Sequence, residues 1–246
     1  MESYVLCAIN IGLKAICFLD HLTAPETEKG LSMSLEEIPL YFQAVQRLKY
    51  QYKYAIDVKA GLEIDFAPEH FSRLLKAAGA FSFDVIGGAV HFPCGLDIVT
   101  GASPLKRGET DADRAYAVYF KSLGKMVEHG SFDVVCHFDL IKKFGIFSTT
   151  RSFEKEIDGI LSKIKSAGMT LEVNASGFDH LAGEPYPGYD IIKKCFNNKI
   201  GLTLGSDAHS PQAVGRHLKR VLRMMRSAEY GHVVTFAKRK KEKISL

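Results

Sequence analysis

Acidic and imidazole side chains recur in this chain at one kind of position, directly after an apolar run. In chain order they are Asp20-His21, Glu63-Ile64-Asp65, His91, His137-Phe138-Asp139, Glu172-Val173-Asn174 and Asp207-Ala208-His209. Imidazole and carboxylate groups ligate metals and transfer protons. The remaining histidines fall in helical or loop contexts and are predicted to lie at the surface: His70, His129, His180, His217 and His232.

Gathering so many of these groups at one place is costly without cations. A buried polar or charged group without a partner costs on the order of several kcal/mol. Divalent ions remove that cost, and mixed imidazole and carboxylate ligands suit Zn, Mn or Fe. A carboxylate can also bridge two cations about 3.5 to 4 Å apart. The residue types therefore predict a divalent-metal centre.

The last two residues of this set show how an extended backbone could direct two ligands to the same metal centre. Asp207 and His209 end the stretch "GLTLGSDAH", two positions apart. Side chains at i and i+2 point to the same side of an extended chain. We therefore expect both side chains to converge on the metal centre.

The apolar runs that precede these residues are predicted to be six buried strands. They cover residues 14–21, 57–65, 83–91, 132–137, 170–174 and 201–209. Their nearly continuous apolar character is typical of parallel strands covered on both faces. Stretches of helical period lie between them. One opens at Ser34 and Glu37 with capping-box spacing, and another places Phe153, Ile157 and Ile164 on one face.

Alternating strands and helices indicate an α/β fold, either a doubly wound sheet or a barrel. No glycine-rich phosphate fingerprint follows the first predicted strand. A barrel would bring the carboxyl ends of all its strands together in one mouth, where active sites of such folds lie. The residues at the strand ends therefore favour a barrel.

Composition indicates an ordinary globular protein, predicted to form one domain over residues 1–246. The chain is 46% apolar and 24% charged, with a formal net charge of +4. Much of that excess lies in 237–243, which we expect to be a solvated end rather than a nucleic-acid site. The N-terminal stretch has neither a signal-peptide pattern nor the length to span a membrane. Five cysteines without C-x-x-C spacing favour a reduced, cytoplasmic setting.

Six motifs in order resemble the PHP superfamily of metal-dependent phosphoesterases, and among them the monofunctional histidinol-phosphate phosphatases. The motifs are "FLDH", "GLEIDF", "GGAVHF", "VCHFDLIKKFG", "LEVNASG" and "LGSDAHSPQAVG". The resemblance spans nearly the whole chain. It implies a distorted (β/α)7 TIM-like barrel with a trinuclear metal site at the carboxyl ends of its strands.

The resemblance assigns metal-binding roles to six residues. Glu63 would bridge the first two ions, with Asp207 on the first. His91 and His137 would bind the second ion, and His21 and His209 would hold the third. These ions would activate a bridging water for attack on phosphorus, and Asp207 or His209 would protonate the leaving alkoxide. Glu63, Asp207 and His209 are therefore the predicted catalytic residues.

The resemblance also suggests a substrate, L-histidinol phosphate, and residues to bind it. Asp97 matches a position in the family's substrate loop, and its carboxylate would pair with the amine of the substrate. Glu172 and Asn174 are predicted to lie at the mouth, near substrate or ligands. Basic residues in mouth loops would bind the phosphate, and Lys142, Lys143 and Arg216 are the candidates. The oligomeric state is not indicated.

One departure from the family pattern concerns the first strand. The family begins with a strand that bears D-x-H-x-H and a further histidine, and the printed sequence contains no such segment. The sequence therefore predicts a barrel without its first strand, in which the second metal alone keeps all its protein ligands. Either an upstream segment supplies this strand, or a shortened barrel is real.

Three rival functions remain open at this point. The chain could hydrolyse another small phosphate ester, such as a nucleotide or sugar phosphate. It could be a catalytically impaired barrel that only binds a ligand. It could also be an amidohydrolase, since such enzymes carry a similar barrel mouth of histidine and aspartate.

Overall fold

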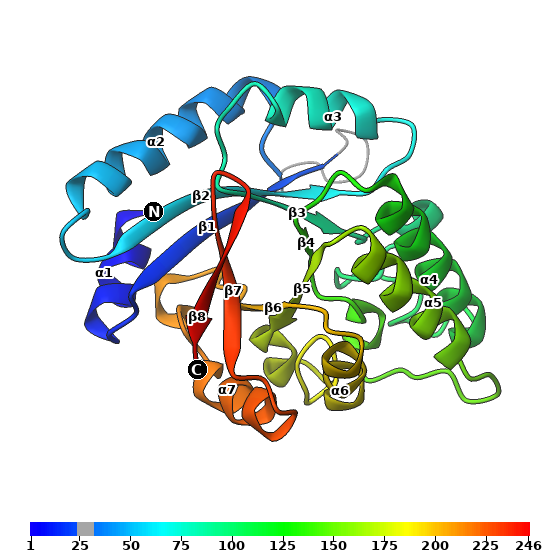
Figure 1. Ribbon diagram of the computed structural model, residues 1–246. Helices are drawn as coiled ribbons and strands as arrows, with labels where there is room; N and C mark the ends of the chain where they lie inside the picture. The colour runs from blue at the N-terminus through cyan, green and yellow to red at the C-terminus, as the bar shows by residue number, and fades with distance from the viewer. Residues whose placement is uncertain (24–31) are drawn as a thin grey trace.

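The computed structural model describes residues 1–23 and 32–246. Six parallel strands form one sheet in which spatial order follows chain order. The sheet curls into a half-barrel, as Figure 1 shows. Its strands are β1 (Ala15–Leu22), β2 (Asp57–Asp65), β3 (Val85–Ala89), β4 (Val134–Val135), β5 (Thr170–Asn174) and β6 (Leu202–Gly205). All six predicted strands are confirmed, and the α/β fold class with them.

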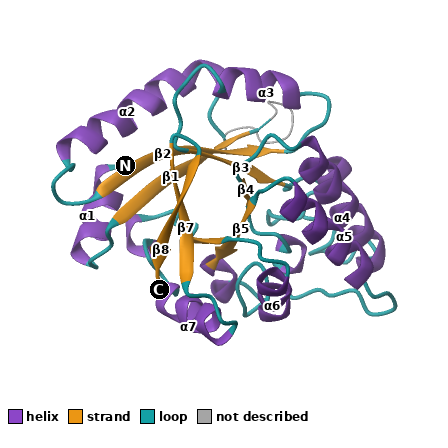
Figure 2. Cartoon of the chain, viewed as in Figure 1, coloured by secondary structure: helices purple, strands orange, loops and turns teal. Residues whose placement is uncertain are grey.

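Helices cover the convex side of this sheet (Figure 2). They are α1 (Glu2–Asn10), α2 (Ile38–Gln51), α3 (Phe71–Ala78), α4 (Ala112–His129), α5 (Glu154–Ser166), α6 (Tyr189–Asn197) and α7 (Leu218–Ser227). Local sequence explains several of their ends. The predicted capping box of Ser34 and Glu37 precedes α2, Asp111 caps the first turn of α4, and Gly130 ends α4 in a left-handed conformation. No helix in the described ranges is both long and apolar enough to cross a bilayer.

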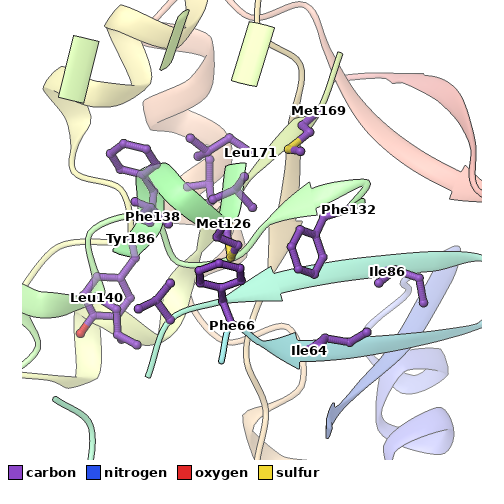
Figure 3. Packing of buried hydrophobic residues seen from close by; sticks show 14 of the residues in the cluster. Ile64, Phe66, Ile86, Met126, Phe132, Phe138, Leu140, Met169, Leu171 and Tyr186 are labelled. Carbon is purple, nitrogen blue, oxygen red and sulfur yellow. The ribbon is translucent and has the colours of Figure 1, made fainter. Parts of the chain in front are cut away.

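Alternate residues of each strand face the helices and build the main core. Figure 3 shows Ile64 of β2 and Ile86 of β3 in this core, near Phe132 and Met126. All four side chains are at most 4% exposed. Because strand side chains alternate between faces, the neighbours of Ile64 in the chain point the other way, into the concave side. Burial of the outward face therefore directs Glu63 and Asp65 toward the barrel interior.

The C-terminal segment is exposed, as the sequence predicted for residues 237–243, and it also forms regular structure. Residues 232–245 form an antiparallel hairpin of β7 (His232–Ala237) and β8 (Lys240–Ser245). Every β8 side chain is exposed, as expected for so basic a segment. Val234 and Phe236 of β7 pack inside the half-barrel against Val85 and Val134. The hairpin thus fills the lower part of the interior, opposite the mouth.

The hairpin turn is fixed to the amino ends of the sheet strands. The backbone N–H of Lys238 donates to Asp84, and the Arg239 side chain donates to Asp133 at 2.8 Å and to the Ser131 carbonyl. Lys241 donates to the carbonyl of Gly168. Several of the basic residues in this segment are therefore engaged with the protein itself.

Candidate active site

The carboxylate of Glu63 lies at the centre of a cluster of imidazoles. Its Oε1 is 3.3 Å from Nδ1 of His21, 3.5 Å from Nε2 of His91 and 3.4 Å from Nε2 of His137. The side chains of Glu63, His91 and His137 are at most 8% exposed. The structure therefore brings together four of the six predicted metal ligands around one oxygen atom.

Strand register explains why residues so far apart in sequence meet here. His21 pairs with Glu63 across β1 and β2, and Glu63 pairs with Gly87 across β2 and β3. His91 and His137 follow β3 and β4 at the same edge of the sheet. Parallel strands place their carboxyl ends together, so each strand delivers its last inward-facing side chain to one place.

Two of the predicted ligands adopt backbone conformations that L-residues rarely take. His137 has φ 26° and Asp207 has φ 49°. Such backbone costs on the order of 1 to 3 kcal/mol and persists where surrounding structure imposes it, often at functional sites. Here the bend re-aims each side chain toward the mouth as its strand ends.

The cluster carries strongly coupled charges. Burial alone would raise the pKa of Glu63, but the three imidazoles hold it below its ordinary value. Burial would lower the pKa of His137, yet Glu63 raises it to about 9. For His91, Asp65 and Glu63 outweigh burial and raise the pKa. Without cations the site must therefore keep protons on buried imidazoles, which divalent ions would replace.

The donor atoms fit a metal ion on two further counts. One ligand atom each from His21, Glu63 and His91 lies within 4.8 Å of the others. The buried Nδ1 atom of His137 has no hydrogen-bond partner in the described part of the chain. Imidazole nitrogens and a carboxylate are the ligands that Zn, Mn and Fe accept. The arrangement is therefore a possible metal site.

Asp207 and His209 lie at the outer edge of this cluster. The Ser176 hydroxyl donates to Oδ2 of Asp207 at 3.2 Å. His209 is more exposed, with 72% of its side chain open to solvent, and its Nδ1 lies 3.0 Å from the Asp207 carbonyl oxygen. Its ring centre is 5.9 Å from that of His21. The two residues therefore border the same mouth, although the expected extended geometry gives way to a bend at Asp207.

Glu172 and Asn174 of β5 form the neighbouring wall. Oε2 of Glu172 accepts hydrogen bonds from the backbone N–H of His137 at 3.0 Å and from the Asn174 amide at 3.2 Å. Burial, together with the charges of Asp207 and Glu63, raises the pKa of Glu172 to about 7. Both side chains thus support the cluster from beside it, and Glu172 can exchange a proton near neutral pH.

Lys142 is placed differently from the sequence expectation. Its ammonium group donates to Asp139 at 2.7 Å and to Glu184 at 2.8 Å, and its side chain is only 5% exposed. Asp139 also accepts the backbone N–H of Gly188 at 3.1 Å. Lys142 therefore joins the segment after β4 to the loop at 184–188, and this buried pairing argues against direct contact with substrate.

Asp97 is also engaged within the protein. Its carboxylate accepts the backbone N–H groups of Val99 and Thr100 at 2.8 and 2.9 Å, and the Thr100 hydroxyl as well. Burial alone would raise the pKa of Asp97, but these hydrogen bonds lower it below its ordinary value. The carboxylate stabilises its own loop, so its geometry gives no support to a contact with a substrate amine.

The other two basic candidates lie at the mouth. Lys143 donates to the Val99 carbonyl at 2.9 Å. Burial lowers the pKa of Lys143, although the negative charges of Asp207 and Asp97 act to raise it. Arg216 pairs with Asp179 at 2.8 Å and is 41% exposed. Both keep N–H groups that could reach an anion.

Two further residues take part in ways that the sequence analysis did not predict, although Asp65 is among the strand-end residues that it named. Asp65 orients His91 by accepting its backbone N–H at 2.8 Å. His180 is half-buried rather than at the surface, with Nδ1 3.0 Å from the Tyr186 hydroxyl. Burial and then Lys143 lower the pKa of His180. A single sequence carries no signal for His180, because its loop folds back on Asn174 through Tyr186.

Known proteins resemble this chain over most of its length. A model of the PHP domain matches residues 1–176. A Deinococcus radiodurans protein named "Probable histidinol-phosphatase" is 29% identical over 240 residues, covering 97% of this chain and 91% of its own. The histidinol-phosphatase of Lactococcus lactis is 26% identical, covering 98% of this chain and 90% of its own.

Solved structures agree on the fold. The crystal structure of histidinol phosphate phosphatase from Lactococcus lactis, complexed with zinc, L-histidinol and phosphate, superposes with a TM-score of 0.80 at 21% identity. The superposition covers 98% of this chain and 92% of that chain. Together with the family match over residues 1–176, these likenesses show that the chain belongs to the PHP domain family.

Proposed function

We propose that this protein is a metal-dependent phosphomonoester hydrolase that acts on L-histidinol phosphate. The observation that carries the proposal is the Glu63 carboxylate, shared by His21, His91 and His137 within 3.5 Å. The names of the relatives point to the substrate. A zinc-bound relative with L-histidinol and phosphate supports the metal and the ester.

The metal ligands would be the six residues of the sequence prediction, holding two or three divalent ions. Glu63, His91 and His137 are fixed by their strands and buried, whereas His21, Asp207 and His209 border the opening. Zinc is the ion we favour, with Mn and Fe as alternatives of similar ligand preference. When bound, such ions lower the pKa of coordinated water and screen phosphoryl oxygens.

The chain's own residues would do the rest of the chemistry. Lys143 and Arg216 would bind the phosphoryl oxygens that the ions leave free. Asp207 and His209 lie nearest to the opening and are the candidates to protonate the departing alkoxide. Glu172 would hold the backbone of His137 in place and tune the charge of the site. Asn174 would fix the orientation of Glu172.

We also propose that residues 1–246 form one domain of the barrel type. A single large cluster of buried apolar residues runs from Val5 to Tyr230, so the described ranges share one core. The five free cysteines favour a reducing, cytoplasmic setting.

The test is hydrolysis of a panel of phosphomonoesters by the zinc-loaded protein. We expect L-histidinol phosphate to be preferred over nucleotide and sugar phosphates, and Glu63→Ala to be inactive. If another ester is preferred, the proposed phosphatase chemistry would stand but the proposed substrate would be wrong. Tight zinc binding without hydrolysis of any ester would favour the impaired barrel, and cleavage of C–N bonds would favour an amidohydrolase.

A further inference from the structure

One imidazole near the mouth is not among the predicted metal ligands. His180 lies in the loop that follows β5, and its side chain is half-buried. This loop packs on the segment after β4, since a Cβ placed at Gly145 would lie 3.0 Å from Cβ of Leu181. Besides burial, Lys143 and Asp207 lie close enough to shift the pKa of the His180 ring, in opposite directions. His180 is therefore close to a proposed phosphate ligand and to a proposed metal ligand.

Tyr186 holds this loop in place and orients the imidazole. Its backbone exchanges two hydrogen bonds with Asn174, at 2.7 and 3.0 Å. Its side chain is fully buried, and its hydroxyl lies 3.0 Å from Nδ1 of His180. The two rings are stacked, with 28° between their planes. A residue of the core therefore fixes how the His180 ring is turned.

The buried hydroxyl of Tyr186 decides which nitrogen of His180 carries the proton. In the described ranges this hydroxyl has no hydrogen-bond partner other than Nδ1 of His180. A buried donor left unpaired is costly, so the hydroxyl donates to Nδ1. Burial and then the charge of Lys143 lower the pKa of His180, so the ring is neutral near pH 7 and has a single N–H group. That proton is on Nε2.

Several nitrogen donors at this side of the mouth have protons to spare. Nε2 of His180 makes no hydrogen bond within residues 1–23 and 32–246. The Lys143 ammonium group uses one of its three protons, on the Val99 carbonyl. Arg216 uses Nε on Asp179 and keeps its terminal N–H groups. Such a set of donors suits a ligand whose atoms only accept, and a phosphoryl group offers three such oxygens.

We propose that His180 binds the phosphoryl group of the substrate by donating its Nε2–H to one of the oxygens, beside Lys143. This role rests on the proposed phosphatase function and adds a substrate-binding residue to it. Tyr186 is the positioning residue, because it occupies Nδ1 and leaves Nε2 as the donor. With the Lys143 ammonium group close by, an anionic acceptor is favoured over the amine or the imidazole of L-histidinol phosphate.

The test is the affinity of the zinc-loaded protein for inorganic phosphate, measured by isothermal titration calorimetry. Two amide variants place a donor at different ends of the ring: the nitrogen of Gln falls near the position of Nε2, and that of Asn near Nδ1. His180→Gln should keep the affinity within about threefold, whereas His180→Asn should weaken it about tenfold or more. If His180 only held its loop through Tyr186, the order of the two variants would be reversed.

Two further measurements make the result specific. His129→Gln changes an exposed imidazole at the end of α4 that precedes β4, and should leave phosphate affinity unchanged. Zinc content is measured in every variant, so that loss of an ion is not mistaken for loss of a phosphate contact. Nitrogen-15 NMR of the histidine rings in the metal-free protein, near neutral pH, should show the His180 proton on Nε2 and none on Nδ1.

Three results would overturn the role of His180. They are a proton on Nδ1, equal phosphate affinity in both amide variants, and affinity that is kept in His180→Asn but lost in His180→Gln. If the zinc-loaded protein binds phosphate with the expected order of variants but does not hydrolyse L-histidinol phosphate, the proposed substrate fails and the phosphate contact stands. If it hydrolyses the ester while both variants bind phosphate equally, the contact alone fails.

Discussion

The carboxylate of Asp65 holds His91 at two points. Its Oδ1 accepts the backbone N–H of His91 at 2.8 Å and lies 3.3 Å from Nδ1 of the same residue. With Nδ1 engaged on that side, Nε2 faces Oε1 of Glu63 at 3.5 Å. A carboxylate behind an imidazole fixes the ring and raises its basicity as a ligand.

Asp65→Asn should therefore weaken zinc binding without unfolding the protein. The amide keeps an oxygen for the His91 N–H but loses the charge that favours the ligating ring. We expect zinc affinity to fall about 10- to 100-fold, measured by competition with a chromophoric chelator. Asp97→Asn makes the same change in a carboxylate that stabilises its own loop, and should leave zinc affinity unchanged. Equal affinity of Asp65→Asn and the unmodified protein would contradict this role.

Lys142→Met should destabilise the protein strongly. It leaves Asp139 buried without its cation, and breaking a buried ion pair costs roughly 3 to 5 kcal/mol. Urea unfolding of the metal-free protein measures this loss. Lys194→Met removes an ion pair of similar length, 2.7 Å to Asp158, at the surface, and should cost less than about 1 kcal/mol. If both substitutions lower the free energy of unfolding equally, the buried pair of Lys142 and Asp139 contributes no more to stability than a surface ion pair.

Gly87→Ala should be destabilising because its side chain would enter the packed interior. An added Cβ would lie 2.6 Å from Sγ of Cys136 and 3.3 Å from Leu19. Overpacking of this kind costs roughly 1 to 3 kcal/mol. Adding Cys136→Ala removes the clashing sulfur, so the double variant should be more stable than the sum of the single changes predicts.

The matched control for Gly87 is Gly159 in α5. No atom lies within 4 Å of a Cβ placed there, so Gly159→Ala should stabilise the helix by about 0.5 to 1 kcal/mol. Thermal and urea unfolding of the four variants completes the comparison. Strict additivity between positions 87 and 136 would show that the interior is looser than the structure indicates.

Much of this architecture could be predicted from sequence because its signals are local. An apolar run followed by Glu63 or His91 needs only strand alternation to place the last side chain inward. The capping box at Ser34 likewise depends on neighbours in the chain. Parallel pairing then gathers the strand ends, so the cluster around Glu63 followed from the fold class.

What could not be predicted depends on contacts between distant segments. Lys142 is of a residue type that binds phosphate, but in the folded protein its ammonium group is paired with Asp139 and Glu184. The hairpin in the exposed basic tail was not predicted, because the residues that hold its turn, such as Asp133, lie about a hundred positions away. His180 was placed at the surface because only the folded loop brings it to Tyr186.

Glu172 should make the metal-free protein less stable as pH rises. Its pKa is about 7 in the folded protein against an ordinary value of 4.5, because burial disfavours the charged form. Between these values the folded protein holds a proton that the unfolded chain has released. The contribution of Glu172 to the free energy of unfolding is therefore fully present below pH 4.5. It is lost as pH rises to about 7, which lowers the free energy of unfolding by up to roughly 3 kcal/mol.

Glu172→Gln removes this titration, so its unfolding free energy should be flatter across that pH range. His137 contributes in the same direction but at higher pH, since its stabilisation is lost as pH rises from 6.5 to about 9. The measurement is urea unfolding after chelation, from pH 4.5 to 9. A slope below pH 7 that is unchanged in Glu172→Gln would show that another group titrates there, and that Glu172 is already charged in the folded protein.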